Sequence, residues 1–314
     1  MPVEEALERL LALAEAAPIK DIERVSLAEA EGRVLATDLV ASLDLPPWPN
    51  SAMDGYALRL ADWQGEPLVV SQRIFAGHAP DALQPGTCAR IFTGAPLPAG
   101  ADCVEMQENT AVLDDGRVRF LEPLKVDQNV RPQGQETRKG EQVMCAGTRL
   151  GPIELGLAAT LGYAEVDVVR RVRVAVLSTG DELVEPGQPL GPGQIYNSNR
   201  RLLVSWLQRL GCEVRDSGIL PDDLARTREC LASLGDVDLI LSTGGVSVGE
   251  ADYLGAALRE AGELALWKLA IKPGKPLTFG HYHGVPVIGL PGNPASTLVT
   301  FGPVSYTHLT LPTK

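Results

Sequence analysis

Apolar residues recur with a helical period at the start of the chain and in strand-like runs farther on. Residues 3–17 carry an apolar stripe that ends before Pro18, which predicts a helix. A second helix is predicted over residues 26–36, because Ser26 is a suitable N-cap and Glu29 follows three residues later. The chain is therefore expected to open with helices.

Residues 45–140 have a different texture, with short β-like runs separated by glycine and proline. A short helix and a strand return within residues 141–170. We therefore expect a β-rich domain, residues 45–140, inserted into a discontinuous helical domain made of residues 1–44 and 141–170.

From residue 171 to residue 301, buried strands alternate with amphipathic helices. The pattern predicts strands at 172–179, 213–220, 238–243 and 263–271, helices at 200–211, 222–235 and 253–262, and a hairpin over 276–290. Strands that alternate with helices at this spacing are joined by right-handed crossovers. The predicted fold class is α/β, with a doubly covered and mostly parallel sheet next to the discontinuous helical domain and its β-rich insert.

Unusual residues gather where these predicted strands end. The segments are STGDE at 178–182, PDD at 221–223, STGGVSVGEAD at 242–252 and KPGKP at 272–276. Ligands of parallel sheets bind beyond the carboxyl ends of the strands. We expect the four loops to form one binding rim.

The third of these loops is rich in glycine and in hydroxyl side chains. Gly244 and Gly245 allow positive φ angles and a close approach of backbone N–H groups to an anion, and Ser242, Thr243 and Ser247 add hydroxyl donors. The lysine of a P-loop and the glycine spacing of a dinucleotide fold are both missing. An anion-binding nest and an ordinary tight turn fit this loop equally well.

Carboxylates occupy the same predicted strand ends, namely Asp181, Glu182, Asp222, Asp223, Glu250 and Asp252. Asp222 and Asp252 each precede a predicted helix, where capping alone explains an acidic residue. As a set, however, the six form an acidic edge that Mg²⁺ would neutralise, since Mg²⁺ is usually held by one or two carboxylates plus ligand phosphates.

Lysines supply the opposite charge near the fourth strand. Lys268, Lys272 and Lys275 lie within eight residues, and the neighbouring prolines stiffen the segment. Farther on, GLPGNPAS predicts a rigid turn before a helix that opens at Ala295, and the N-terminus of that helix could bind an anion. A bare turn is the alternative interpretation of this segment.

Two stretches of the β-rich segment also favour a ligand site. PPWPNSAMDGYAL and IFTGAPLPAGAD place Asp54 and Thr93 in loops framed by proline and glycine. Turn formation explains the prolines and glycines but not Asp54 beside the apolar Met53. We expect a rigidly held carboxylate at Asp54.

Composition narrows the classes of function. A formal net charge of -12 argues against nonspecific nucleic-acid binding, which needs surplus lysine and arginine. No apolar run of membrane-spanning length and no secretory leader is present, so neither a membrane nor export is expected. The five cysteines never form a CxxC pair, and this favours the reducing cytoplasm over a disulfide framework or a zinc site.

Eight motifs, in this order, carry a family resemblance: PPWPNSAMDGYA, IFTGAPLPAGAD, NVRPQG, STGDEL, YNSN, STGGVSVGEADY, KPGKP and LPGNP. Together they closely resemble the MoeA family of molybdopterin molybdenumtransferases, whose eukaryotic relatives include the gephyrin E domain. The resemblance runs from about Val3 to about Phe301.

The resemblance implies an enzyme that inserts molybdenum from molybdate into adenylyl-molybdopterin with Mg²⁺ and releases AMP. It also implies a homodimer, with the upstream molybdopterin adenylyltransferase as a further partner. Carried over by motif, Glu182, Asp222 and Asp252 would serve the metal, whereas Asp54 and Thr93 would line the cleft from the partner subunit. The implied ligand-binding residues are Ser178, Thr179, Gly180, Ser242, Thr243, Gly244, Gly245, Ser247, Lys268, Lys272, Lys275, Pro291, Gly292, Asn293, Pro294 and Ser296.

The chain departs from the family pattern in two places. Gln135 and Glu136 stand where the family usually has Glu and then Asp. The family also continues into a further small β domain, whereas this chain ends GPVSYTHLTLPTK, so residues 302–314 are interpreted as a non-native tail.

Two other functions remain open at this point. The related molybdopterin adenylyltransferase and the competence-damage-type amidohydrolases share the α/β domain but lack the MDGYA module. The presence of residues 51–56 therefore distinguishes this chain from both. A noncatalytic scaffold is the second alternative, and the set of carboxylates and lysines argues against it.

Overall fold

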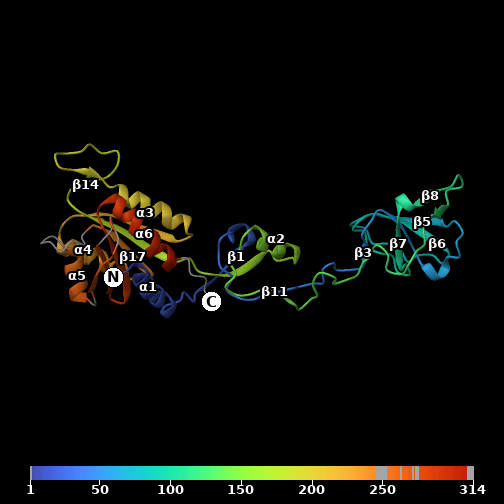
Figure 1. Ribbon diagram of the computed structural model, residues 1–314, viewed down its shortest axis with the longest axis horizontal. Coiled ribbons are helices and arrows are strands. Elements are labelled where there is room, and N and C mark those ends of the chain that lie inside the picture. The colour runs from blue at the N-terminus through green and yellow to red at the C-terminus, as the bar shows by residue number, and fades with distance from the viewer. Residues whose placement is uncertain (1, 245–252, 262–263, 271, 273–275, 310–314) are drawn as a thin grey trace. The chain divides into compact units, whose positions relative to one another are not determined.

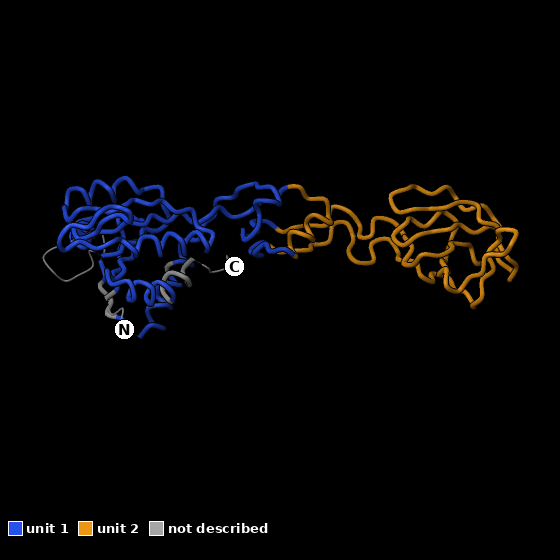
Figure 2. The backbone as a smooth tube through the Cα atoms, turned by 90° about the horizontal axis from the view of Figure 1, so that it is seen from above, with its two compact units in different colours: residues 1–37, 146–152, 165–314 blue, residues 38–145, 153–164 orange. Residues whose placement is uncertain are grey.

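The structure is a computed structural model that describes residues 2–244, 253–261, 264–270, 272 and 276–309 (Figure 1). The chain divides into two compact units, coloured in Figure 2. Unit 1 comprises residues 1–37, 146–152 and 165–314, and unit 2 comprises residues 38–145 and 153–164.

A six-stranded sheet in the order β16-β13-β17-β20-β19-β18 forms the centre of unit 1. Its strands are β13 (Arg173–Thr179), β16 (Glu213–Leu220), β17 (Leu239–Thr243), β18 (Leu264–Lys268), β19 (Pro276–Tyr282) and β20 (Val285–Leu290). Strands β16, β13, β17 and β20 run parallel, and β19 is antiparallel to both of its neighbours. The α/β fold class with a mostly parallel sheet is confirmed.

Helices cover both faces of this sheet. Helices α1 (Val3–Ala16), α3 (Ser198–Arg209) and α6 (Pro294–Leu309) share one face, and α4 (Leu224–Ala232) and α5 (Tyr253–Ala261) share the other. The alternation along β13 explains the two layers, because Val174 and Val176 pack into the first core and Ala175 and Leu177 into the second. Each core buries these side chains completely.

The predicted hairpin over 276–290 is present. Strands β19 and β20 pair antiparallel from Thr278 and Gly289 to Tyr282 and Val285. His283 and Gly284 connect them, with φ angles of 48° and 87°. Two consecutive positive φ angles are what a tight two-residue hairpin turn requires.

The prediction of a second helix over residues 26–36 is wrong. Residues 22–26 form strand β1 (Ile22–Ser26), which pairs antiparallel with β12 (Glu165–Val169), and only one 3₁₀ turn follows at Leu27–Glu29. The Ser26 hydroxyl does donate a hydrogen bond to Glu29 at 2.8 Å. The residues after Glu29 pair with distant parts of the chain instead of continuing a helix. The Leu35 N–H, for example, donates to the carbonyl of Thr148 and not to a residue four positions earlier.

Unit 2 is built from short strands. They are β2 (Leu39–Val40), β3 (Asn50–Ser51), β4 (Gly55–Leu58), β5 (Val69–Ile74), β6 (Thr87–Ile91), β7 (Cys103–Met106), β8 (Thr110–Val112), β9 (Val118–Phe120), β10 (Val130–Arg131) and β11 (Gln142–Met144), with helix α2 (Pro152–Thr160) continuing into this unit. A four-stranded sheet in the order β5-β6-β4-β7 holds its core together. Two short strands of unit 1, β14 (Leu183–Val184) and β15 (Ile195–Tyr196), complete the elements.

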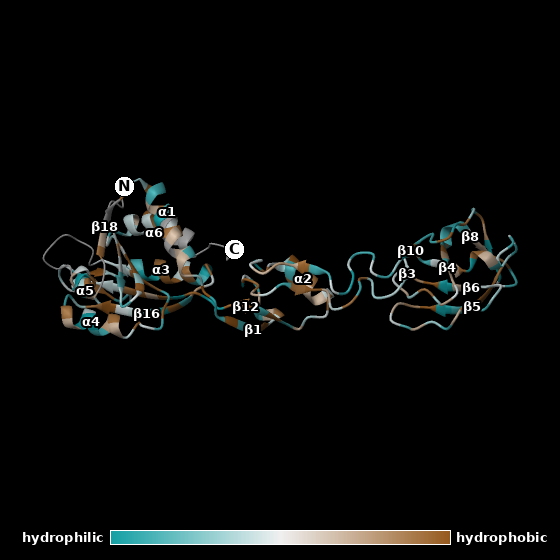
Figure 3. Cartoon of the chain, turned by 90° about the horizontal axis from the view of Figure 1, so that it is seen from below, coloured by the Kyte–Doolittle hydropathy of each residue, from teal (hydrophilic) through white to brown (hydrophobic). Residues whose placement is uncertain are grey.

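Hydrophilic and hydrophobic residues are mixed along the helices. Helix α2, for example, carries both hydrophilic and hydrophobic residues (Figure 3). Within the described part of the chain, none of the helices combines the length and the apolar character that a membrane crossing demands.

Candidate active site

The strand order reverses at the carboxyl end of β13, and the region beyond that end is named the crevice. The chain leaves β13 toward β16 on one side of it and later returns to β17 on the other, and α3 and α4 cover opposite faces. Such a reversal of strand order is where open α/β sheets bind ligands. Here it joins the loops that follow Thr179, Leu220 and Thr243.

Backbone hydrogen bonds tie these strand ends together. The N–H of Gly180 donates to the carbonyl of Leu220, and the N–H of Gly244 donates to the carbonyl of Leu290, each at 3.3 Å. The structure therefore brings the loops after β13, β16, β17 and β20 to one edge.

Two glycines make this close approach possible. Gly180 has φ 141°, and a Cβ there would lie 2.3 Å from the Glu182 carboxylate. Gly244 has φ 82°, and a Cβ there would lie 2.6 Å from the carbonyl oxygen of Thr179. Any side chain at Gly244 would have to separate the ends of β13 and β17.

Three acidic side chains meet at the edge. The N–H of Asp222 donates to Asp181 Oδ1 at 3.1 Å. Burial raises the pKa of Asp222 above the usual 3.8, and the negative charges of Asp181 and Glu182 raise it further. The crevice is thus negative in its own right and favours a cation or a proton.

Helix capping falls to Asp223 rather than to Asp222. The Asp223 carboxylate accepts the N–H of Arg226 at 2.8 Å and serves as the N-cap of α4. Capping is therefore wrong as the explanation of Asp222, whose carboxylate instead accepts a backbone hydrogen bond from Asp181. Among the residues that the structure describes, no group of three or more His, Cys, Asp or Glu side chains is arranged to hold a metal ion.

Two buried asparagines belong to this edge, and the sequence analysis gave them no role. Asn197 is 2% exposed and caps α3, and Asn199 is 6% exposed in the first turn of that helix. The Asn199 amide nitrogen donates to the carbonyl of Gly292 at 2.7 Å and to Thr243 Oγ1 at 3.3 Å. The YNSN motif signalled the position, but only the fold reveals that Asn199 joins three loops.

Buried polar atoms without a hydrogen-bond partner belong to the same group of residues. Thr179 Oγ1, the Asn197 amide nitrogen and the Asn199 amide oxygen have no hydrogen-bond partner in the described part of the chain. Each such atom costs about 1–3 kcal/mol when it is left unsatisfied. Three of them on neighbouring loops indicate a site that a polar ligand or water completes.

The segment Pro291–Pro294 forms the predicted turn ahead of α6. Asn293 Oδ1 accepts the N–H of Ser296 at 3.2 Å, which caps the helix. Ser296 itself is buried, and the hydroxyl of Thr297 donates to the carbonyl of Pro291 at 2.6 Å. The carbonyl of Gly292 faces Asn199, so this turn packs against the crevice.

The remaining rim residues divide into three groups. Ser178 donates to Asn197 Oδ1 at 3.4 Å, and Ser242 donates to the carbonyl of Gly244 at 3.3 Å. Strands β18 and β20 are both antiparallel to β19 and therefore run in the same direction. Lys268, the last residue of β18, thus lies at the same edge of the sheet, and Lys272 follows it in the chain and is exposed. Gly245, Ser247, Glu250, Asp252 and Lys275 lie outside the described residues.

In unit 2, Asp54 and Thr93 form a tight pair. Asp54 Oδ1 accepts both the N–H and the hydroxyl of Thr93, each at 2.7 Å. These two bonds lower the pKa of Asp54 from its usual value, with a smaller contribution from the charge of Arg90. Two hydrogen bonds from Thr93 therefore anchor the Asp54 carboxylate through its Oδ1 atom.

Comparison with known proteins covers nearly the whole chain. Residues 1–162 match the model of the MoeA N-terminal region (domain I and II), and residues 175–309 match a model described as "Probable molybdopterin binding domain". A Haemophilus influenzae protein named molybdopterin molybdenumtransferase is 46% identical over 89% of this chain and 70% of its own length. A Synechococcus elongatus protein of the same name is 42% identical over 94% of this chain and 76% of its own.

Solved structures agree with these sequence matches. The crystal structure of a molybdopterin biosynthesis MoeA protein from Pyrococcus horikoshii aligns with a TM-score of 0.83 and 34% identity, over 98% of this chain and 79% of that chain. The fold of this chain is thus shared with a solved protein of 34% sequence identity. The chain belongs to the MoeA family.

Proposed function

We propose that this chain is a molybdopterin molybdenumtransferase, an enzyme of molybdenum cofactor biosynthesis. Membership of the MoeA family and relatives of that name at 42–46% identity support the assignment. The observation that carries the chemistry is the set of unpartnered buried polar atoms beside three carboxylates at the carboxyl end of the sheet.

The proposed substrates are adenylyl-molybdopterin and molybdate, and the proposed product is the molybdenum-loaded pterin with release of AMP. Thr179, Asn197 and Asn199 offer buried donors and acceptors for the polar groups of such a ligand. Lys272 is exposed beyond the end of β18 and supplies a positive charge for molybdate or phosphate oxygens. Lys268, Lys275 and Ser296 complete the proposed anion-binding set.

Mg²⁺ is the proposed metal, and Glu182 and Asp222 are its proposed ligands, with Asp252 as a third. The described residues fit this ion, because Mg²⁺ needs only one or two carboxylates when ligand phosphates supply other oxygens. Burial, together with the nearby charges of Asp181 and Glu182, raises the pKa of Asp222, and a bound divalent cation would favour its ionised form. When bound, Mg²⁺ would neutralise charge on the phosphoanhydride.

The proposal extends to a homodimer in the cytoplasm. Asp54 and Thr93 would face the ligand from the partner subunit, and the fixed orientation of the Asp54 carboxylate suits a positioning role. The upstream molybdopterin adenylyltransferase is the proposed donor of the nucleotide-bound pterin.

An AMP-release assay tests the proposal directly. The purified protein is incubated with adenylyl-molybdopterin, Mg²⁺ and molybdate, and AMP is quantified over time. We expect AMP release that depends on molybdate and that falls at least about a hundredfold in Glu182→Gln. A folded protein that releases no AMP under these conditions would remove the transferase assignment.

A further inference from the structure

Unit 1 contains a second cavity, of about 400 Å³, that no part of the proposed function uses. Five arginines line it: Arg33, Arg149, Arg170, Arg171 and Arg209. Most of the remaining wall is aliphatic, and Glu31 is the one carboxylate in the lining. Such a concentration of arginine stands out in a chain with a net charge of -12.

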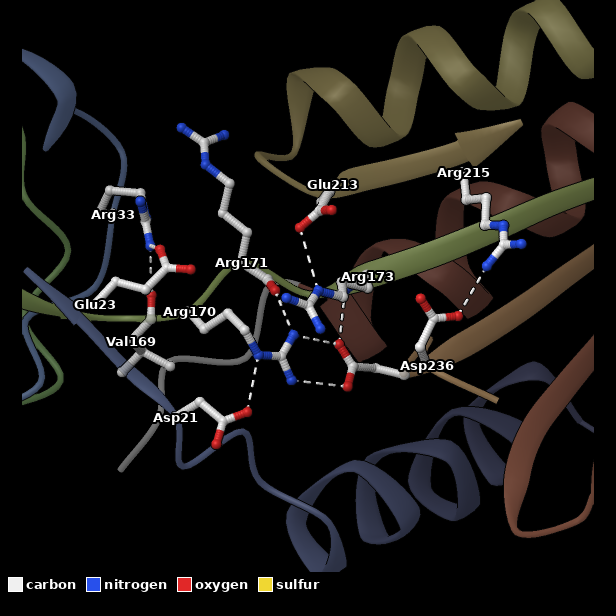
Figure 4. A network of polar contacts seen from close by, with 11 residues as sticks. Asp21, Glu23, Arg33, Val169, Arg170, Arg171, Arg173, Glu213, Arg215 and Asp236 are labelled. Carbon is white, nitrogen blue, oxygen red and sulfur yellow. Dashed lines mark hydrogen bonds and ion pairs between the residues drawn. The ribbon is translucent and has the colours of Figure 1, made fainter. Parts of the chain in front are cut away.

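Two of the arginines build the frame of the cavity. Arg33 donates to Glu23 at 2.6 Å and to the carbonyl of Val169 at 2.9 Å (Figure 4). Arg170 binds Asp238 through two nitrogens at 2.9 and 3.0 Å and also reaches Asp21 at 3.0 Å. Their side chains are only 8% and 11% exposed, so the frame is rigid and its charge is compensated.

The other three arginines are not compensated. Arg149, Arg171 and Arg209 are exposed, and none of them pairs with a carboxylate in the described part of the chain. Arg171 donates to the carbonyl of Gly211 at 3.2 Å and touches none of the carboxylates drawn in Figure 4. A guanidinium stays protonated at every relevant pH, so the mouth of the cavity is positive.

The C-terminus of α3 reaches the cavity and ends in a capping turn at Gly211. Gly211 adopts φ 86°, and the N–H groups of Gly211 and Cys212 return to the carbonyls of Gln208 and Leu207. The carbonyls of Leu207 and Gln208 are thereby paired within the chain.

This cavity is separate from the crevice described above. The crevice contains Asn199 at the first turn of α3, and the cavity contains Arg209 at the last residue of that helix. A helix of 12 residues is about 18 Å long. The two sites therefore lie at opposite ends of the sheet.

We propose that this arginine pocket binds an organic monophosphate of nucleotide size. Arginine forks bind phosphate oxygens in pairs, and Arg149, Arg171 and Arg209 are available for this. The volume lies within the range of small-molecule sites, and the aliphatic wall suits the apolar body of a nucleoside.

Calorimetric titration with AMP, adenosine and inorganic phosphate tests the proposal on the full chain. The buffer contains EDTA, so that a metal-dependent site does not contribute. We expect AMP to bind more tightly than either of the other two probes and less tightly as salt is added. Arg149→Ala and Arg209→Ala should each weaken AMP binding about tenfold or more.

Arg215→Ala is the matched control, because Arg215 is also an exposed arginine of unit 1 and pairs with Asp236 outside the cavity. It should bind AMP as wild type does. Both pocket arginines are exposed, and an unchanged unfolding midpoint verifies that their variants fold.

Three results would overturn the proposal. One is AMP binding that is equal in wild type and in the Arg149→Ala, Arg209→Ala double variant. Another is adenosine binding as tightly as AMP, since this would exclude the arginines from recognition. The third is an equal loss of AMP binding in Arg215→Ala, since the effect would then follow net charge and not the cavity.

Discussion

Adjacent acidic residues in this chain have different tasks. Asp223 is used by the backbone of α4, whereas Asp222 faces Asp181 and Glu182 in the crevice. Sequence reasoning could not divide these tasks, because either residue stands where an N-cap is expected. The residue at which α4 begins decides which of the two carboxylates caps the helix.

Removing the charge of Asp222 should stabilise the metal-free protein near neutral pH. The folded-state pKa of Asp222 is raised, so its contribution to stability is full below about pH 4 and is lost as the pH rises through the folded value. Asp222→Asn should therefore gain up to about 1 kcal/mol over wild type at pH 7 and little near pH 4. Urea unfolding from pH 4 to pH 7.5 measures the difference.

Asp223→Asn is the control for this experiment, since asparagine caps a helix about as well as aspartate. Its unfolding free energy should stay near that of wild type. An Asp222→Asn variant that is less stable than wild type at pH 7 would show that favourable contacts of the Asp222 carboxylate outweigh the cost of its burial and of the nearby charges.

The residues named by motif were predictable, but their connections were not. Gly180, Gly244 and Gly292 were expected in a ligand loop, and the structure places all three at the crevice. Asn199 was missed because its partners, Thr243 and Gly292, are 44 and 93 residues away. A contact over such a separation leaves no local signal in the chain.

At the scale of elements, the close approach of the ends of β17 and β13 requires a residue without a side chain at position 244. Gly244 lies against the carbonyl of Thr179 at the end of β13. This contact lets Asn199 and the turn at Gly292 approach from the next loop.

Gly244→Ala should therefore cost more than a turn glycine normally does. The new methyl group would meet the Thr179 carbonyl oxygen at 2.6 Å, and the residue would also keep φ 82°. We expect a loss of about 2–4 kcal/mol of unfolding free energy, from the strained backbone and the overlap together. Chemical denaturation of the purified variant measures it.

Gly284→Ala provides the comparison. Gly284 has a similar φ of 87°, but a methyl group there meets nothing within 4 Å. Only the backbone strain remains, so about 1 kcal/mol should be lost. Equal losses at the two positions would mean that the strand ends separate without cost.

Helices and strands were predicted well where the hydrophobic pattern is long, and poorly where a segment pairs with a strand far away in the sequence. The strands and helices after residue 171 follow their hydrophobic periods. Residues 26–36 contain a sound capping signal and still form no α-helix, because β1 pairs with β12 at more than a hundred residues' separation. Local propensity is a weak term beside such pairing.

At the scale of the whole molecule, the candidate residues are divided between the two units. Glu182 and Asp222 belong to unit 1, and Asp54 and Thr93 belong to unit 2. If one copy supplies the first pair and its partner the second, each catalytic site is shared by two chains.

Mixed dimers test this sharing. Asp54→Asn and Glu182→Gln chains carry different tags, are expressed together, and are purified through both tags. Each variant alone should be inactive in AMP release, whereas the mixed dimer should recover about half of the wild-type activity, since one of its two sites is intact. An inactive mixed dimer would place both pairs within a single copy.

The order in which the chain visits the two units has a consequence for its synthesis. Residues 38–145 and 153–164 complete unit 2 while most of the six-stranded sheet is still untranslated. Helix α1 precedes unit 2 in the chain, yet its Ala6 and Leu10 share a core with Phe301, which follows unit 2. We therefore expect unit 2 to become protease-resistant during translation before helix α1 does.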